Sequence, residues 1–291
     1  MDILYLTFPL AILAIFSMAI GLGILLRRRF RFTWRLYIIG AAVFLLSQVF
    51  HIPFNIGFGL LMQRGVLPTP PPEYTILFQI VFLGLSAGIF EEGARYLMYR
   101  FWTRDARSWA KGLMAGAGHG AGGEAMIFVG FLMLVNFLVM VVFRNSDLSR
   151  IVSPDQLSLV EQQVNDYWSA AWYLPLIAVL ERAFAIILHL SLSILVLQVF
   201  TRRRIIWLGL AILWHALANA AALYAAMTWG VYHSEAAVGI FALLSLGIIF
   251  ALRTPEPAEN QDPKPITPPL QTLSRLEIEE DSDRLEDSRY L

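Results

Sequence analysis

Acidic and histidine side chains recur inside four long apolar segments of this 291-residue sequence. Ionisable groups are costly in an apolar surrounding and usually serve a function there. The polar groups, in chain order, are Glu91, Glu92, Arg95, His119, Glu124, Glu181, Arg182, His189, His215 and Asn219. Counted from the basic end of each segment, most of the acids and histidines lie roughly 12–18 Å deep at 1.5 Å per helical residue. This shared depth favours one common site over scattered structural contacts.

Two pairs of these residues are four positions apart and therefore share a helical face. Glu91 and Arg95 can form an ion pair, whereas Glu92 lies about 100° round the same helix and points elsewhere. His215 and Asn219 have the same spacing on their own helix. Taken singly, the Glu91–Arg95 pair and Asn219 are more typical of buried structural contacts. The coincidence of acids, histidines and an asparagine at one depth is what favours a site.

The fourth apolar segment has an irregular spacing. His119 and Glu124 are five residues apart, about 140° on an ideal α-helix, so they can meet only where the backbone leaves α geometry. Glycines surround them at 116, 118, 120, 122 and 123. Such a run permits close helix packing or a local break that lines a cavity. In the fifth segment Arg182 and His189 share one side, and Glu181 with Arg182 is expected to be a structural pair.

Carboxylates and imidazoles together are suited to two mechanisms of hydrolysis. In the first, histidines and a carboxylate hold zinc, and a bound water becomes acidic. In the second, which needs no metal, a glutamate helped by a histidine activates water while a nearby histidine and asparagine stabilise the oxyanion. Either mechanism would hydrolyse a peptide bond, and the sequence does not distinguish between them. His51 and His233 are expected outside the site, because His51 has no acidic neighbour in sequence and His233 falls in a loop.

The composition places these segments in a membrane. The chain is 57% hydrophobic and 15% charged, whereas soluble domains carry about 25% charged residues. It contains no cysteine, which excludes disulfides, thiolate ligands and a cysteine nucleophile. Apolar blocks of about 18–30 residues can cross a ~30 Å hydrocarbon core as helices. We predict an all-α bundle of seven transmembrane helices, at about 3–26, 36–61, 75–102, 112–143, 171–200, 205–229 and 235–252.

The basic residues predict the orientation of this bundle. They cluster after the first, third and fifth predicted helices, at 27–35, 100–111 and 202–204. By the positive-inside rule, the N-terminus lies outside and the C-terminus lies in the cytoplasm. The segment near 154–170 has the pattern of a short amphipathic helix at the interface. We divide the chain into a membrane domain over 1–252 and a disordered, proline- and acid-rich cytoplasmic tail over 253–291.

Four motifs carry a resemblance to a known family. They are Glu-Glu-Gly-Ala-Arg at 91–95, Gly-Ala-Gly-His-Gly at 116–120 followed by Glu124, Glu-Arg-Ala-Phe-Ala at 181–185 followed by His189, and His-x-x-x-Asn at 215–219. In this order, on successive membrane helices, they resemble the YhfC family of intramembrane peptidases. That family is similar to the wider group of CAAX prenyl endopeptidases, bacteriocin-processing proteases and PrsW proteases. The resemblance covers roughly residues 1–252.

The resemblance implies catalytic roles for single residues. A glutamate of the pair Glu91 and Glu92, with His119, is similar to a water-activating base. His215 and Asn219 resemble an oxyanion-binding pair. The implied supporting residues are Arg95, Glu124, Glu181 and Arg182.

The metal and the partners are also expectations. If zinc is bound, His119, His189 and His215 are its expected ligands, and His189 could otherwise orient a base. Glu124 follows its histidine by five residues where the family pattern has four, so its role stays open. The leading hypothesis is an endopeptidase of the plasma membrane. We expect it to act on a peptide or membrane-protein substrate from a cytoplasm-facing cavity in the lipid bilayer, with no nucleic-acid partner.

Two other functions remain open at this point. A non-catalytic scaffold or partner-binding subunit could keep the same fold. A proton-coupled transporter is also possible, because buried glutamate and histidine chains relay protons in such proteins. The helix pattern shows no internal repeat, which many transporters have.

Overall fold

The computed structural model describes residues 2–255, and this part of the chain contains helices and no strand. Seven helical spans are long and apolar enough to cross a membrane. They are Leu4–Phe30, Arg35–Gln63, Pro72–Trp102, Trp109–Arg144, Leu174–Thr201, Ile206–Trp229 and Val231–Ala251. These spans confirm the all-α membrane fold, with bounds within a few residues of those predicted. The orientation of the termini stays a prediction.

Two of the spans change helical geometry along their length. The third consists of a 3-10 turn η1 (Pro72–Tyr74), α3 (Thr75–Leu97) and a π-turn η2 (Met98–Trp102). The fourth consists of α4 (Trp109–Ala117), the π-helix η3 (Gly118–Gly130) and α5 (Phe131–Arg144). The remaining spans are α1, α2, α7, α8 and α9, in the order and with the bounds given above.

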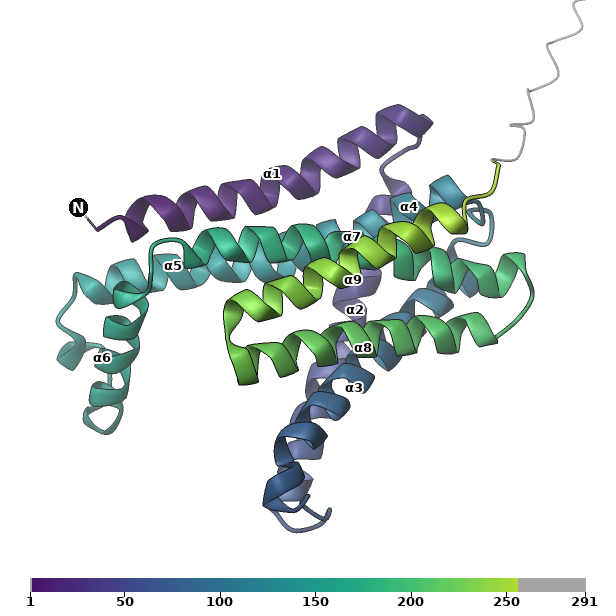
Figure 1. Cartoon of the computed structure of the whole chain (residues 1–291). Helices are drawn as coiled ribbons and strands as arrows, with labels where there is room; N and C mark the ends of the chain where they lie inside the picture. The colour runs from purple at the N-terminus through teal and green to yellow at the C-terminus, as the bar shows by residue number, and fades with distance from the viewer. Residues whose placement is uncertain (1, 256–291) are drawn as a thin grey trace, which may run out of the picture. The chain divides into compact units, whose positions relative to one another are not determined.

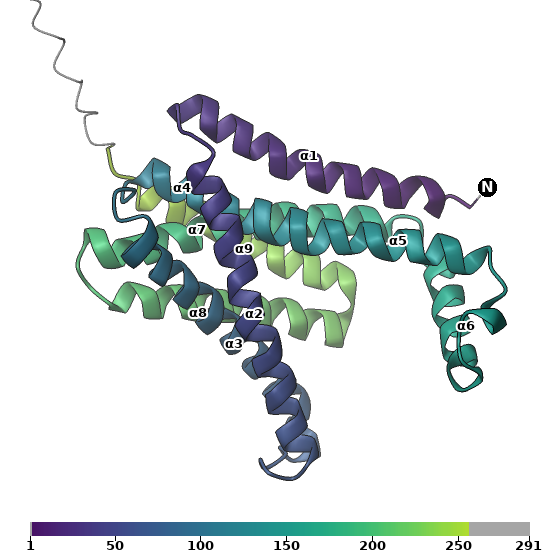
Figure 2. The ribbon, with the colours of Figure 1, turned by 180° about the vertical axis from the view of Figure 1, so that it is seen from behind.

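Helix α7 forms the centre of the bundle. It is the most buried of the seven spans and packs against α1, α3, α4, α8 and α9. Helices α2 and α3 run side by side and are steeply inclined to α1 and α7 in both views (Figures 1 and 2). Helix α3 of this inclined pair packs on α8, and α2 packs on η3. The pair therefore covers one side of the helices that surround α7.

The glycine run of the fourth span lets neighbouring helices approach closely. A Cβ at Gly118 would lie 2.0 Å from the carbonyl oxygen of Tyr37 on α2. A Cβ at Gly120 would lie 2.6 Å from Cβ of His189 on α7. Since neither position has room for a side chain, η3 packs directly on α2 and α7. Close packing and a departure from α geometry, which the sequence offered as alternatives, therefore occur together.

Two further predictions concern segments outside the spans. The predicted amphipathic helix is present as α6 (Pro154–Ser169), and Val164 is its one buried residue. It follows the short turn η4 (Leu148–Arg150). The predicted acidic tail lies, beyond Pro255, outside the described residues, so its disorder and the domain boundary stay predictions.

Candidate active site

Four helices bring the predicted acids and histidines together. Glu91, Glu92 and Arg95 come from α3, His119 from η3, His189 from α7 and His215 from α8. Each of these six residues is at most 7% exposed. Buried charges are tolerated only when they are paired or coordinate a metal. The contacts of each group therefore indicate what it can do.

The first glutamate faces α2 and η3. Oε2 of Glu91 lies 3.3 Å from Nε2 of His119. The side-chain amide of Gln48 on α2 donates a hydrogen bond of 3.1 Å to Oε1 of the same carboxylate. The ring of Phe44 packs edge-on against His119, with 5.2 Å between ring centroids. Glu91 is thus held by one amide and faces one imidazole.

The second glutamate faces α8 and Arg95. Oε1 of Glu92 accepts a hydrogen bond of 2.9 Å from Nδ1 of His215. Nη1 of Arg95 donates to Oε2 of Glu92. The expected ion pair between Glu91 and Arg95 is therefore wrong. The guanidinium turns instead to the carboxylate three residues away, because Glu91 points toward α2 and η3.

His189 lies at the centre of the cluster. Nη2 of Arg95 lies 3.1 Å from Nδ1 of His189. Because a guanidinium has no acceptor, Nδ1 must accept, and the neutral ring carries its proton on Nε2. That Nε2 lies 2.5 Å from Oε2 of Glu124. The rings of His119 and His215 lie 5.3 Å and 5.5 Å from the His189 ring, centroid to centroid. His189 thus contacts Arg95 of the first motif, His119 and Glu124 of the second, and His215 of the fourth.

The π-helix explains the five-residue spacing in the fourth span. A π-helix forms its hydrogen bonds between residues five apart, so His119 and Glu124 stand nearly above one another and both face His189. Glu124 also accepts a bond of 2.5 Å from Nη1 of Arg182. Nη2 of Arg182 donates to Glu181 over 2.6 Å. The Glu181–Arg182 pair forms as expected, and Glu124 joins it to the cluster.

Asn219 and His233 do not contact this cluster. Asn219 is half-buried and makes no hydrogen bond within residues 2–255, so its oxyanion role stays a prediction. His233 is exposed in the first turn of α9, where its Nδ1 lies 3.0 Å from the carbonyl of Trp229.

Sequence reasoning missed the contribution of α2. Gln48, His51 and Asn55 lie on one face of this helix and form a chain of hydrogen bonds that ends at Glu91. His51 touches no acid, as expected, but it reaches Glu91 through Gln48. The signal that could have found them is the spacing of three polar side chains at i, i+3 and i+7 in an otherwise apolar segment.

A serine–histidine contact between α2 and α3 has a packing explanation. Ser86 lies in a Gly-x-Ser-x-Gly string, Gly84 to Gly88, and its Oγ is 3.1 Å from Nε2 of His51. The string lies within the continuous helix α3, not in the strand-to-helix turn that exposes a serine nucleophile. A Cβ at Gly84 or Gly88 would lie 2.7 Å from a carbonyl oxygen of α8. These glycines therefore serve the contact between α3 and α8.

Three of the buried side chains are arranged as metal ligands would be. Glu91, His119 and His189 each offer a ligand atom, and these atoms lie within 4.8 Å of one another. Nδ1 of His119 is buried and has no hydrogen-bond partner within residues 2–255. Two imidazoles and a carboxylate are a known ligand set of catalytic zinc. The residues fit a divalent metal, provided that one ring nitrogen of His189 exchanges its present contact with Arg95 or Glu124 for the metal. The expected ligand His215 is not among these three side chains, so its metal role stays a prediction.

Comparison with known proteins agrees with the motifs and the helices. The model of the family described as "YhfC intramembrane metalloprotease" matches residues 13–242. The chain belongs to the YhfC family. A relative described as "Uncharacterized membrane protein YhfC", from Bacillus subtilis (strain 168), is 33% identical over 236 residues, which cover 79% of this chain and 87% of that protein. No solved structure matches significantly.

Family membership confirms the resemblance seen in the motifs and the assignment as an integral membrane protein. The name of the YhfC family indicates a metal-dependent intramembrane protease. The relative's description names no activity, substrate or metal.

Proposed function

We propose that the protein is an intramembrane endopeptidase that hydrolyses a peptide bond at the buried cluster between α3, η3, α7 and α8. One observation carries the proposal: Glu91, His119 and His189 converge from three helices to within metal-ligand reach. Structural ion pairs alone do not require an imidazole whose free nitrogen is buried without a partner, as in His119.

In this proposal Glu91, His119 and His189 hold a zinc ion. When bound, zinc would acidify a water molecule and polarise the carbonyl of the substrate. Gln48 keeps the Glu91 carboxylate in place through the hydrogen bond to its Oε1. The buried surroundings exclude bulk water and strengthen the interactions of these charges.

Glu92 and His215 are assigned to proton transfer with the substrate. Glu92 is fixed by Arg95 and accepts a hydrogen bond from Nδ1–H of His215, so it orients the imidazole. The opposite nitrogen of His215, Nε2, has no partner within the described part of the chain and is free to exchange a proton with the reacting groups. An imidazole with a fixed tautomer and a free nitrogen is suited to general acid–base catalysis.

A metal-free variant of the same reaction uses the same residues. Glu91, whose Oε2 lies 3.3 Å from His119 Nε2, would activate water directly with the help of that histidine. The two mechanisms differ in metal content, which can be measured without knowledge of the substrate.

The test is zinc content of the purified protein. Wild type is purified in mild detergent without chelator, beside Glu91→Gln, His119→Ala and His189→Ala. We expect about one zinc per chain in wild type and its loss in all three variants. His233→Ala is the matched control, because His233 is exposed and lies outside the cluster.

A folded wild type without zinc would remove the metal mechanism. Cleavage would then be tested by comparing membrane-protein processing in cells that carry wild type or Glu91→Gln. If processing is identical in the two and the protein holds no metal, the peptidase proposal fails.

A further inference from the structure

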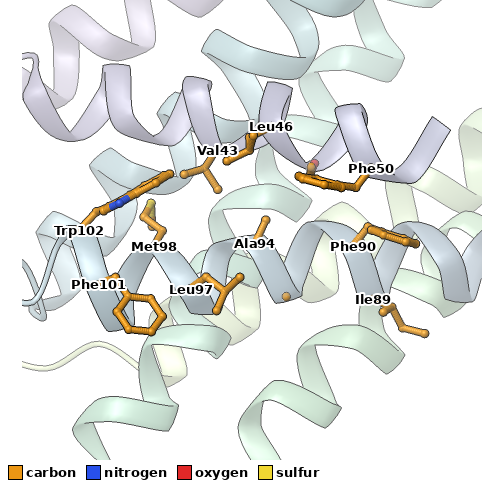
Figure 3. Close-up of a pocket in the computed structure, with 12 residues that line it drawn as sticks. Val43, Leu46, Phe50, Ile89, Phe90, Ala94, Leu97, Met98, Phe101 and Trp102 are labelled. Atoms are coloured by element: carbon orange, nitrogen blue, oxygen red, sulfur yellow. The ribbon is translucent and has the colours of Figure 1, made fainter. Parts of the chain in front are cut away.

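A cavity of about 480 Å³ lies between α2 and α3 on the side away from α8. Figure 3 shows Val43, Leu46 and Phe50 of α2 facing Ala94 and Met98 of the third span, with Leu97 and Phe101 on the opposite side of that span. It extends along the third span from Ile89 to Trp102, about 20 Å at 1.5 Å per residue. Phe90 and Ala94 belong to its lining and flank the two glutamates of the cluster in sequence.

The cavity has almost no free hydrogen-bonding capacity. Apart from Trp102 at its end, Ser47 is the one lining side chain, among those described, with a strong polar atom. Its hydroxyl donates a hydrogen bond of 2.6 Å to the carbonyl of Phe44 and accepts one of 3.3 Å from Nε2 of Gln48. The N–H and C=O groups of an extended peptide would therefore stay unsatisfied there, at a cost of several kcal/mol per group.

The size of the cavity favours a thin occupant over a helix. A helix about 10 Å wide and 20 Å long occupies roughly 1,500 Å³, which exceeds the empty space of about 1,010 Å³ between the lining residues. A long, narrow, apolar space of this size fits a single hydrocarbon chain.

Gly93 keeps this space open. A Cβ at Gly93 would meet no atom within 4 Å, whereas a Cβ at Gly84 or Gly88 of the same helix would meet the backbone of α8. Gly93 lines the cavity, so its missing side chain does not serve helix packing. A side chain introduced at position 93 would therefore start from open space and extend into the cavity.

Two unpaired cations stand at the end of the cavity. The guanidinium carbons of Arg100 and Arg104 lie 5.8 Å and 6.0 Å from the ring centre of Phe101, which lines the cavity. Neither arginine pairs with an acid within residues 2–255, and the neighbouring Asp105 is already bound to Arg35 at 3.1 Å. Nε of Arg104 donates to the carbonyl of Arg100, which leaves the Nη groups of both arginines without an acid among the described residues. An apolar slot that ends at two such guanidiniums matches a ligand with a hydrocarbon chain and an anionic head.

We propose that the cavity binds one acyl chain of an anionic phospholipid, with the phosphate of the headgroup on Arg100 and Arg104. Basic pockets at the end of transmembrane helices attract anionic headgroups, and each arginine contributes about 1 kcal/mol. The acyl chain would fill the gap between α2 and α3, next to Glu91 and Glu92. The proposal does not depend on peptidase activity.

Trp102 provides the readout. Phosphatidylglycerol with brominated acyl chains is added to the protein in detergent, and tryptophan emission is measured for wild type and Trp102→Phe. Bromine quenches an indole that it touches, so the difference between the two proteins reports lipid in the cavity. We expect saturable, Trp102-dependent quenching by brominated phosphatidylglycerol, and brominated phosphatidylcholine to need a higher concentration. Replacing Arg100 and Arg104 by glutamine should weaken phosphatidylglycerol binding about fivefold for each arginine.

The matched control uses two open glycines. Gly93→Phe fills the cavity and should abolish the Trp102-dependent quenching. A Cβ at Gly209 of α8 would also meet no atom within 4 Å, and Gly209 does not line the cavity, so Gly209→Phe should leave the quenching unchanged. The proposal is overturned if wild type and Trp102→Phe are quenched equally, if the two lipids bind equally well, or if a folded Gly93→Phe is quenched like wild type.

Discussion

Arg95 donates a hydrogen bond of 3.1 Å to Nδ1 of His189, a residue 94 positions away on another helix. The same guanidinium neutralises Glu92. One cation therefore both sets the tautomer of the central histidine and compensates the charge of a fully buried carboxylate. Removing Arg95 should therefore lower the stability of the protein as well as impair its function.

Arg95→Leu leaves Glu92 buried without its counter-charge. Breaking a buried ion pair on one side costs about 3–5 kcal/mol. We expect a strongly lowered unfolding midpoint in detergent for Arg95→Leu, and recovery of more than half of that loss in the double variant with Glu92→Gln. Thermal unfolding followed by tryptophan emission measures both. A double variant no more stable than the single one would show that the ion pair is not the cause.

Gln48→Leu should weaken metal binding without removing a ligand. Partners that hydrogen-bond a metal ligand typically contribute 10–100-fold to affinity, and Gln48 holds Oε1 of Glu91. Zinc affinity, measured by competition with a fluorescent chelator, should fall by about that factor. Gln198→Leu is the control, since this buried amide bonds Ile194 at the other end of the bundle. An equal loss in both variants would indicate general destabilisation.

Gly118→Ala should destabilise the bundle. Its Cβ would lie 2.0 Å from the Tyr37 carbonyl, so α2 and η3 would have to separate. Overpacking of this kind typically costs about 1–3 kcal/mol. Gly57→Ala meets no atom within 4 Å and should leave the unfolding midpoint unchanged or raise it slightly. If the two substitutions have the same effect, the close contact is not required.

Asp2→Asn should destabilise the N-terminal contact in a pH-dependent way. The Arg144 guanidinium, 2.8 Å from Asp2, donates a hydrogen bond that holds the pKa of this carboxyl below its usual value. A lowered pKa stabilises the folded state above the unfolded pKa of about 4, and the effect disappears as pH falls through the folded pKa. The difference in unfolding midpoint between wild type and Asp2→Asn should therefore be present at pH 7, begin to shrink below about pH 4 and vanish below the lower folded pKa. A difference that is independent of pH would contradict the ion pair.

The absence of cysteine allows a direct test of the orientation. Ser149→Cys in the η4 turn should react with a membrane-impermeant maleimide on intact cells, because the positive-inside rule places this turn outside. Thr33→Cys in the basic connection between α1 and α2 should react only after the cells are opened. The opposite labelling pattern would reverse the predicted topology.

The sequence by itself determined the helical spans and the layer of the site. In hydrocarbon the backbone must satisfy its own hydrogen bonds, so an apolar block long enough to span becomes a helix whatever its neighbours are. The depth of Glu91, His119 and His189 then follows from counting residues along each helix. The five-residue spacing of His119 and Glu124 even indicated where α geometry ends, as η3 confirms.

Only the tertiary structure decided which of these groups meet. The spacing predicted Glu91 as the partner of Arg95, but the guanidinium pairs with Glu92, because the partner depends on how α3 is rotated against its neighbours. That rotation is set by Gly84 and Gly88, which seat α3 on the backbone of α8 and turn Glu91 toward Gln48. Contacts between helices depend on the packing of both partners, and a pattern along one helix carries no information about the other.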